Sequence, residues 1–510
     1  MNHPKNATSS GTVLLINPVY NKKATLGPFT KYITSQLPLS IGFLAGYILD
    51  KGIPVHVEDE QLAQLTDEYL ESIIAKYSPR IVGMTVYTLT APRAYELGRK
   101  IKSKWPDIKV VMGGVHVTLM PEEPLELGAA DFVVRNEGEI TFYELITHLN
   151  ANQSVEGIDG LSFQKDGAVV RNPERALISN LDDLPMFPYH LFEKNIKEYQ
   201  FGNMLTSRGC PYNCIFCSQK SISGQQYRSR SPKRVVEELD ILANKYNQDF
   251  VFFNNDNFIV NENLCYEICD LIISRNYPKN FKIAINARGD AVTKKLLSRM
   301  REAHFMTIIF GLETGSERIM KLVKKGETVA EIEKGVRIAK KCGFIVSGQF
   351  ILGFPTETRA ESFQTIWHAL RLPLDFTRFN LLVPYPGSEI FDMAKADKKI
   401  NLDWSNYASH SALTGKTIPY IPDGRTAKDL ARLQWFGNMA FFFRPRQLFN
   451  INKIRYGTAG QVILPDIYSF KGMAEMIGFA FKLVFFMLKQ QLTIKFSGNH
   501  LTNDRHFGEK

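Results

Sequence analysis

Short apolar strands alternate with helical segments along most of this chain, and this alternation is the strongest constraint on its fold. In the first 150 residues, each predicted strand is short, β-branched and bounded by glycine, proline or asparagine. These strands are Val13–Ile16, Val55–Val57, Ile81–Thr85, Lys109–Met112 and Phe132–Val134, with helical patterns at Leu39–Leu49, Asp67–Tyr77 and Ala91–Lys104. Strands that alternate with helices form parallel βαβ units, so residues 11–150 are predicted to form a doubly wound, Rossmann-like α/β domain.

A second βα series follows a connector over residues 151–200. The connector contains a predicted hairpin, Leu161–Val170, with Asp166 and Gly167 at its turn. The strands of the second series are Met204–Thr206, Val251–Asn254, Lys282–Asn286, Thr307–Leu312, Ile345–Leu352 and Arg378–Leu382. Six such strands predict a partial TIM-type (β/α)6 barrel over residues 201–390. The alternation then stops, and residues 391–510 are predicted to be mostly helical.

Composition narrows the class of protein. The 510 residues are 44% hydrophobic and 22% charged, as in ordinary globular proteins. Most of the net charge of +10 falls after Arg425, so the rest of the chain lacks the basic surface of a nucleic-acid binder. Six cysteines are too few for a disulfide scaffold. With neither a signal-peptide pattern nor a long apolar run, the sequence predicts a cytoplasmic protein.

Three of the six cysteines fall within eight residues, at Cys210, Cys214 and Cys217, directly after the first predicted barrel strand. Barrels of this type carry their chemistry on such loops. A structural zinc site is closed by four ligands, and no histidine is near enough to supply the fourth. A [4Fe–4S] cluster held by three thiolates keeps one iron open for a substrate or cofactor. Chance clustering of buried cysteines and a zinc site are the alternatives.

The spacing C-x3-C-x2-C resembles the signature of the radical SAM superfamily. From about residue 11 to 390, the chain further resembles the cobalamin-binding class of these enzymes. The supporting motifs are Leu37-Pro-Leu-Ser-Ile-Gly-Phe-Leu-Ala-Gly46, Val111-Met-Gly-Gly-Val-His116, Glu137-Gly-Glu-Ile-Thr-Phe142, Asn254-Asn-Asp-Asn-Phe258, Gly311-Leu-Glu-Thr-Gly-Ser316, Leu352-Gly-Phe-Pro-Thr-Glu357 and Val383-Pro-Tyr-Pro-Gly387. The resemblance implies three cofactors: a [4Fe–4S] cluster on the three cysteines, S-adenosylmethionine (SAM) and cobalamin.

The resemblance also implies where SAM is held. Asp256 is the candidate acceptor for the SAM ammonium group, with an Asx turn as the alternative. Arg288 is the candidate partner of the SAM carboxylate, with a surface salt bridge as the alternative. Glu313 ends the fourth barrel strand and faces SAM or substrate. Ile351 and Gly353 lie against the adenine, where the glycine gives clearance.

Cobalamin is expected at the carboxyl ends of the first domain's strands. Thr85 ends the third strand, and Gly113 and Gly114 let the backbone approach a large ligand, although a plain tight turn is the alternative. Many cobalamin proteins outside this class carry Asp-x-His-x-x-Gly after the first strand, but this chain has no histidine there. Cobalamin is therefore predicted to lack a histidine on cobalt. His116 is included among the cofactor contacts as a residue near the corrin.

The function implied by the resemblance is radical methylation of an unactivated carbon in a small-molecule or lipid-like substrate, with an electron donor such as flavodoxin or ferredoxin. An oxidative cyclase or rearrangement enzyme with the same cofactors is one alternative, and a non-catalytic cobalamin or SAM sensor is another. A methylthiotransferase is disfavoured, because such enzymes need a second cysteine cluster and no cysteine precedes Cys210. Cys265 and Cys269 share a helix face and are predicted to be core residues.

The last part of the chain has an aromatic and basic composition. Residues 425–510 contain 12 of the 35 phenylalanines, concentrated at Phe441–Arg446 and Met476–Leu488. Such a composition suits a helix lying in a lipid headgroup region, so this region is a candidate for peripheral contact with the inner face of the membrane. A helical cap packed on the barrel is the alternative.

Overall fold

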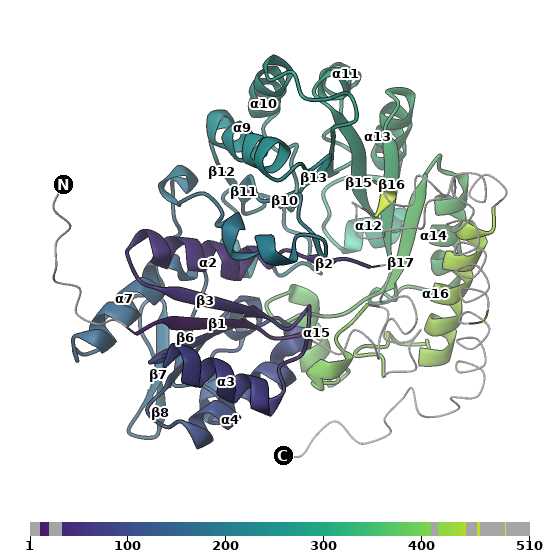
Figure 1. Cartoon of the computed structure of the whole chain (residues 1–510). Helices are drawn as coiled ribbons and strands as arrows, with labels where there is room; N and C mark the ends of the chain where they lie inside the picture. The colour runs from purple at the N-terminus through teal and green to yellow at the C-terminus, as the bar shows by residue number, and fades with distance from the viewer. Residues whose placement is uncertain (1–10, 20–32, 410–416, 445–455, 459–484, 486–510) are drawn as a thin grey trace. The chain divides into compact units, whose positions relative to one another are not determined.

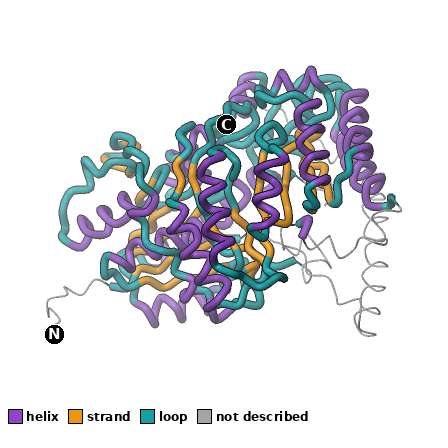
Figure 2. The backbone as a smooth tube through the Cα atoms, turned by 90° about the horizontal axis from the view of Figure 1, so that it is seen from above, coloured by secondary structure: helices purple, strands orange, loops and turns teal. Residues whose placement is uncertain are grey.

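The structure is a computed structural model that describes residues 11–19, 33–409, 417–444, 456–458 and 485 (Figure 1). The chain divides into two compact units. The first contains the residues up to 21, residues 37–198 and residues 221–223, and the second contains residues 22–36, 199–220 and those from 224 onward. In both units, helices flank the strands (Figure 2).

The first unit is built on a seven-stranded sheet in the order β3-β1-β4-β5-β6-β7-β8. Its strands are β1 (Val13–Asn17), β3 (Val55–Asp59), β4 (Ile81–Thr85), β5 (Lys109–Gly113), β6 (Phe132–Val134), β7 (Leu161–Lys165) and β8 (Ala168–Arg171). The first five of these are parallel. The chain runs from β1 to β3 on one side and then to β4 on the other, so the order reverses between β1 and β4. The doubly wound α/β fold is confirmed, and its ligand crevice is expected at this reversal.

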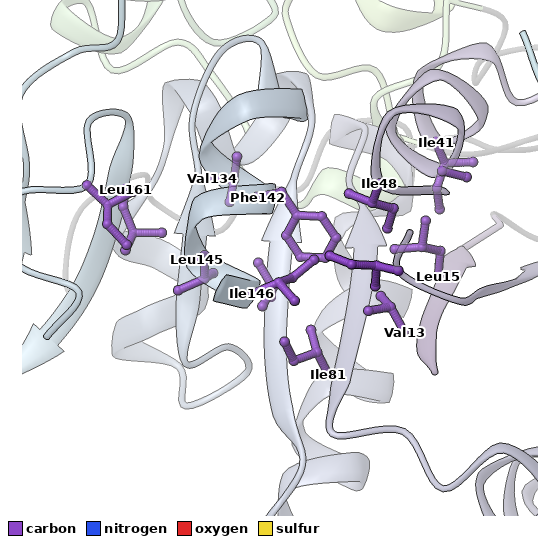
Figure 3. Close-up of a cluster of buried hydrophobic side chains, with 14 of the residues drawn as sticks. Val13, Leu15, Ile41, Ile48, Ile81, Val134, Phe142, Leu145, Ile146 and Leu161 are labelled. Carbon is purple, nitrogen blue, oxygen red and sulfur yellow. The ribbon is translucent and has the colours of Figure 1, made fainter. Parts of the chain in front are cut away.

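Helices cover the sheet of the first unit. They are α2 (Leu39–Asp50), α3 (Asp67–Tyr77), α4 (Ala91–Lys104), α5 (Val115–Leu119), α6 (Glu122–Glu126) and α7 (Gly138–Asn150). Alternate strand residues such as Val13, Leu15 and Ile81 pack with side chains of α2 and α7, among them Phe142, in one buried cluster (Figure 3). Because successive strand residues point to opposite faces, Leu14 and Ile16 are buried on the other face of the sheet. A sheet buried on both faces explains why its strands are apolar throughout.

The predicted hairpin is present, but it is part of the first sheet rather than of a connector. Asp166 and Gly167 have φ of 51° and 80°, the pair of positive values that a tight hairpin turn needs. Strand β7 pairs antiparallel with β6, and β8 pairs with β7. The hairpin thus covers the edge of β6, which would otherwise present unpaired backbone groups.

The second unit contains a six-stranded parallel sheet whose spatial order follows the chain order. Its strands are β10 (Asn203–Met204), β13 (Phe250–Phe253), β14 (Lys282–Ala287), β15 (Phe305–Glu313), β16 (Ile345–Leu352) and β17 (Phe376–Leu381). The helices between and after them are α9 (Pro232–Asp240), α10 (Glu262–Ser274), α11 (Lys294–Glu302), α12 (Glu317–Leu322), α13 (Val329–Lys341), α14 (Arg359–Arg371) and α15 (Glu389–Ala396). This is the predicted (β/α)6 partial barrel.

The C-terminal region is helical only in part within the described residues. Helix α16 (Ala427–Phe442) packs on β17, where the Gln434 amide donates to the Phe379 carbonyl oxygen at 3.0 Å. Between α15 and α16, Ile400 and Tyr420 form a single antiparallel bridge. The stretch Met476–Leu488 lies outside the described residues except for Phe485. Within the described part of the chain, no helix is both long enough and apolar enough to cross a bilayer.

Candidate active site

The three-cysteine loop begins at the carboxyl end of β10 and is closed at its base by two short strands. Strand β11 (Ser207–Arg208) pairs antiparallel with β12 (Arg228–Ser229), which brings the two ends of the loop together. The loop is also held at its middle. The Ile215 amide donates to the Val323 carbonyl at 3.1 Å, and the Ile390 amide donates to the Ile215 carbonyl at 3.1 Å. The cysteines are therefore carried on an anchored loop. Such a loop can hold its ligands in position before the metal binds.

All three cysteines of the loop are free thiols. Burial raises the pKa of Cys210, Cys214 and Cys217, the last to about 12, so without a metal they are protonated at neutral pH. Nearby Lys325 and Arg288 act in the opposite direction on the pKa of Cys214. The Cys217 sulfur accepts a hydrogen bond from the Gln219 amide at 3.4 Å. Bound iron is the strong cation that would deprotonate such thiols.

The described residues contain no group of three His, Cys, Asp or Glu side chains gathered closely enough to hold a single metal ion. Three thiolates that bind three different irons of a cube need not converge on one point. Cys265 and Cys269 lie on α10 and are fully buried, as expected for core residues.

Asn255 and Asp256 follow β13, beside the start of the cysteine loop. The Asn255 side chain accepts from the Thr206 hydroxyl at 3.1 Å and donates to the Ser207 hydroxyl, so it joins the end of β13 to the loop. Asp256 is exposed, yet the protein around it raises the pKa of its carboxyl by partial burial. Its charge acts on both Cys210 and Cys217. An accessible carboxyl beside the cysteines fits the predicted acceptor for an ammonium group.

Arg288 follows β14, and its side chain is buried against the cysteine loop. Its guanidinium lies 3.6 Å from the centre of the Tyr212 ring. Tyr212 stands between the first two cysteines in the sequence of the loop. The guanidinium donates to both carboxylate oxygens of Asp290, at 3.0 and 2.8 Å, and to the Lys325 carbonyl at 2.6 Å. The forked face predicted to hold the SAM carboxylate is therefore taken by Asp290. The salt bridge named as the alternative is present, although the Arg288 side chain is buried rather than at the surface, and the contact of Arg288 with the SAM carboxylate stays a prediction.

Glu313 ends β15 in a left-handed conformation, with φ of 55°. The register between β15 and β16 shifts between Gly311 and Glu313, and such an irregularity re-aims a side chain. The Glu313 carboxylate accepts from Lys325 Nζ at 3.1 Å, and Glu327 lies 3.3 Å from the same nitrogen. Burial alone would lower the pKa of Lys325, but Glu313 and Glu327 raise it above its usual value. Glu313 therefore faces a buried ammonium group close to the cysteines.

Ile351 and Gly353 lie at the carboxyl end of β16. Gly353 has φ of 89°, which a residue with a side chain rarely adopts. Its amide and that of Phe354 both donate to the Glu357 carboxylate, the second at 2.9 Å. A Cβ added at Gly353 would meet Leu430 of α16 at 3.3 Å. The glycine is thus required by the turn itself, and its predicted contact with adenine stays a prediction.

In the first unit, Thr85 and Gly113 end the neighbouring parallel strands β4 and β5 and are paired in register. Gly114 follows with φ of 99° and ψ of 179°, a region open essentially to glycine alone. A Cβ at Gly114 would lie 2.9 Å from the Val86 amide nitrogen and 3.0 Å from the Thr85 hydroxyl. A Cβ at Gly113 would make only ordinary contacts, at 3.4 Å or more. Gly114 is therefore needed to close the turn onto β4, while Gly113 is free to face a ligand.

His116 does not fit its predicted place beside the corrin. Its side chain is 0% exposed, and its ring nitrogens lie 3.3 Å from the Thr88 hydroxyl and 3.0 Å from the Glu123 carboxylate. Tyr95 donates to the same carboxylate at 3.1 Å. With both nitrogens engaged inside the unit, His116 ties α5 to the turn after β4 and to α6. Its assignment as a cofactor contact is corrected to a structural role.

Comparison with known proteins identifies the family. Residues 34–146 match the B12 binding domain, and residues 204–366 match the radical SAM superfamily. An uncharacterized methyltransferase of Pyrococcus horikoshii is 33% identical over 420 residues, which are 81% of this chain and 90% of the relative. The chain belongs to the cobalamin-binding radical SAM enzymes.

Other members of this family are similar over much of the chain. The anaerobic magnesium-protoporphyrin IX monomethyl ester cyclase of Rubrivivax gelatinosus is 28% identical over 407 residues, which are 78% of this chain and 72% of the relative. The hopanoid C-2 methylase of Rhodopseudomonas palustris is 24% identical over 303 residues, 58% of this chain and 54% of the relative. The solved structure of the radical SAM methyltransferase TsrM from Kitasatospora setae, with cobalamin and a [4Fe–4S] cluster, has a TM-score of 0.65 at 19% identity and covers 86% of this chain and 90% of that one. This last likeness concerns the fold.

The cofactors of this radical SAM enzyme are a [4Fe–4S] cluster, SAM and cobalamin. The described residues fit each group. Three free thiols share one anchored loop, Asp256 offers an open carboxyl beside them, and the strand ends of the first unit leave Gly113 free to face a large ligand.

Sequence reasoning missed Lys325, Glu327 and Tyr212. The segment Lys324-Lys-Gly-Glu327 has the composition of an exposed turn, and no local pattern indicates that its second lysine is buried. Tyr212 lies between the first two cysteines, which was the available signal that it lines the site. Its stacking on Arg288 depends on β14 and could not be read from the loop alone.

The Arg288→Lys variant is expected to destabilise the second unit. Lysine keeps the charge but loses the two-pronged pair with Asp290 and the planar contact with Tyr212, at a cost of about 2 kcal/mol. Urea unfolding of the iron-loaded protein measures this change. The control is Arg337→Lys, which alters an exposed pair with Glu333 within α13 and should change stability by less than about 0.5 kcal/mol. Equal effects of the two variants would contradict the structural role of Arg288.

Proposed function

We propose that this enzyme methylates an unactivated carbon of a small-molecule or lipid-like substrate. The observation that carries the proposal is similarity along both units to relatives named as methyltransferases, at up to 33% identity, combined with an intact cysteine triad. When bound, SAM and the cluster supply a 5′-deoxyadenosyl radical, and cobalamin supplies the methyl group. We assign the cobalamin domain to residues 11–150 together with the hairpin of β7 and β8 that extends its sheet, and the radical SAM barrel to residues 201–390.

The chain's own residues position these groups in this proposal. Cys210, Cys214 and Cys217 hold the cluster and leave one iron open. Asp256 accepts the SAM ammonium group, and the turn at Ile351 and Gly353 lies against the adenine. Thr85 and Gly113 lie beside the cobalamin. A low-potential one-electron donor such as flavodoxin or ferredoxin supplies the reducing electron.

Transfer of the methyl group is tested with isotope. The enzyme, reconstituted anaerobically with iron, sulfide and cobalamin, is incubated with dithionite, methyl-labelled SAM and metabolite extract from a strain that lacks the gene. Labelled product together with 5′-deoxyadenosine supports methylation. Deoxyadenosine with an unlabelled, altered metabolite instead supports a cyclase, an alternative favoured by three cyclases among the relatives. Absence of deoxyadenosine under all conditions would leave only the sensor alternative.

We further propose that the C-terminal region and the helix beside it contact a membrane surface of anionic lipid. Helices α14 and α16 pack together, and Phe363 of α14 lies 6.0 Å from Phe436 of α16, ring centre to ring centre. Trp367 and Phe443 are 56% and 55% exposed. Arginines accompany this face: Arg359 lies over Phe363, and Arg371 lies over Trp367. Exposed aromatic rings with arginines beside them suit the headgroup region of an anionic membrane.

Co-sedimentation with vesicles tests this contact. Full-length protein is expected to pellet with vesicles containing phosphatidylserine at low salt and to pellet less at high salt. Changing Trp367 and Phe443 together to serine should reduce the pelleted fraction several-fold, because both rings would leave the interface. The control changes Tyr69, an aromatic residue of the first unit that is similarly exposed. If full-length protein stays in the supernatant throughout, the membrane contact is wrong.

A further inference from the structure

The turn between α12 and α13 buries one of two adjacent lysines and exposes the other. Lys325 is 6% exposed, whereas Lys324 points outward and pairs with Glu389 at 2.7 Å. Lys324 has φ of 51° and Gly326 has φ of 75°, so the backbone reverses around Lys325. Thr328 then caps α13 together with Glu331. The backbone of this turn therefore places the Lys325 ammonium group in the interior and the Lys324 ammonium group at the surface.

Burying a lysine is costly unless opposite charges surround it. Here Glu313 Oε1 accepts from Nζ at 3.1 Å, and Glu327 lies at 3.3 Å. The Glu327 atom at 3.3 Å is Oε1, so Nζ meets one oxygen of each carboxylate, while the other Glu327 oxygen accepts from the Asp290 amide at 3.2 Å. A buried ion pair contributes little net stability, because an apolar side chain of similar size stabilises such a position as well. What the buried Lys325 adds over an apolar side chain is therefore its positive charge.

The buried charge acts on the cysteine loop. The turn that carries Lys325 is joined to this loop, because the Val323 carbonyl accepts from the Ile215 amide at 3.1 Å. The Lys325 carbonyl also accepts at 2.6 Å from Arg288, whose guanidinium lies over the Tyr212 ring of the loop. Lys325 and Glu313 are the charged pair that this turn brings beside the cysteines. Their charges are little screened, because both groups lie inside the protein. Lys324 lies in the same turn but is exposed, so water and salt screen its charge.

We propose that Lys325 is a positioning residue whose buried charge sets the reduction potential of the [4Fe–4S] cluster. Three thiolates already make the oxidised cluster anionic, and accepting one electron from a one-electron donor adds a further negative charge. Lys325 stabilises this added charge and so favours reduction, while Glu313 opposes it. The inference rests on the cysteine triad holding the cluster. Failure of that assignment would appear as loss of iron, whereas failure of the inference would appear as an unchanged potential with iron retained.

Redox titration of the reconstituted enzyme without SAM tests the inference, with dithionite as the electron donor and the reduced cluster followed by EPR. Lys325→Met should lower the ratio of reduced to oxidised cluster at a fixed potential by about tenfold, which is about 59 mV for one electron. Lys325→Arg keeps the charge and should restore most of the parent's potential. Lys324→Met, the matched control, should leave the potential unchanged.

A variant expected to shift the reduction potential in the opposite direction separates the effect of charge from a loss of folding. Glu313→Gln removes the negative charge beside Lys325 and should raise the reduction potential. It disturbs the same contact with Lys325 that Lys325→Met removes, so a general disturbance of this contact would not explain shifts in opposite directions. If Lys325→Met fails to retain iron, the Glu313→Gln measurement decides. The inference is overturned if Glu313→Gln moves the potential downward or leaves it unchanged, or if Lys325→Met retains iron with the parent's potential.

Discussion

Replacing Cys210, Cys214 or Cys217 singly with alanine is expected to remove most of the iron and all cleavage of SAM. The three thiols share one loop that is fixed at its base by the β11–β12 pair and at Ile215 by backbone hydrogen bonds, so no other cysteine can take the place of a missing one. A cluster left with two protein ligands loses both its attachment and its position relative to SAM. Iron analysis and anaerobic assay of 5′-deoxyadenosine measure the two effects.

The controls are Cys265→Ala and Cys269→Ala. Both side chains are fully buried on α10, away from solvent, and should behave as small apolar residues. Each variant should keep the parent's iron content and cleave SAM. Reconstitution of the triple variant at positions 210, 214 and 217 with about four irons per chain would show that the cluster is held elsewhere.

The Gly114→Ala variant is expected to lose cobalamin together with stability of the first unit. Alanine would have to keep a backbone conformation open essentially to glycine, at about 1–3 kcal/mol. Its Cβ would also lie 2.9 Å from the backbone nitrogen of Val86, an atom that cannot move without displacing the end of β4. Strands β4 and β5 form the edge where cobalamin is expected, so about 3 kcal/mol of destabilisation should come with loss of retained cobalamin. Urea unfolding and the visible absorbance of the reconstituted protein report the two quantities.

The neighbouring Gly113→Ala variant separates folding from ligand contact. An alanine Cβ at this position makes only ordinary contacts within the protein, so the stability of the first unit should change little. If cobalamin lies against this backbone, the added methyl group should still weaken its retention. Normal retention in Gly113→Ala would place the cobalamin away from Gly113, and normal stability in Gly114→Ala would contradict the strain argument.

The paired charges at the ends of β14 and β15 suggest a single structural principle for the site. Arg288 and Lys325 bring two cations to the cysteine loop, and each is held by carboxylates from its own neighbourhood, Asp290 for the first and Glu313 with Glu327 for the second. Burial raises the pKa of the loop's thiols, so the surrounding charges and the bound iron together determine the state of the sulfur atoms. Variants of the charged residues therefore test the electrostatics of the loop, whereas variants of the cysteines test its iron content.

The sequence alone determined the elements and the ligand set. Strands such as Ile81–Thr85 and Ile345–Leu352 and the helix Asp67–Tyr77 have the predicted bounds, because hydrophobic periodicity and helix-breaking residues are local properties. The cysteine spacing is also local, since one loop carries the three thiols. The turn at Asp166 and Gly167 was predicted for the same reason.

Only the tertiary structure decided what these elements contact. The hairpin after residue 160 joined the first sheet because β6 needed a partner at its edge. His116, Arg288 and Lys325 all looked accessible in sequence, but packing buried them and supplied partners from 2 to 37 residues away. A side chain's charge partners are set by which strand ends meet in space, and strand order is not written in any local pattern. The sequence therefore predicted the ligands of the cluster, while the fold decided which charges surround them.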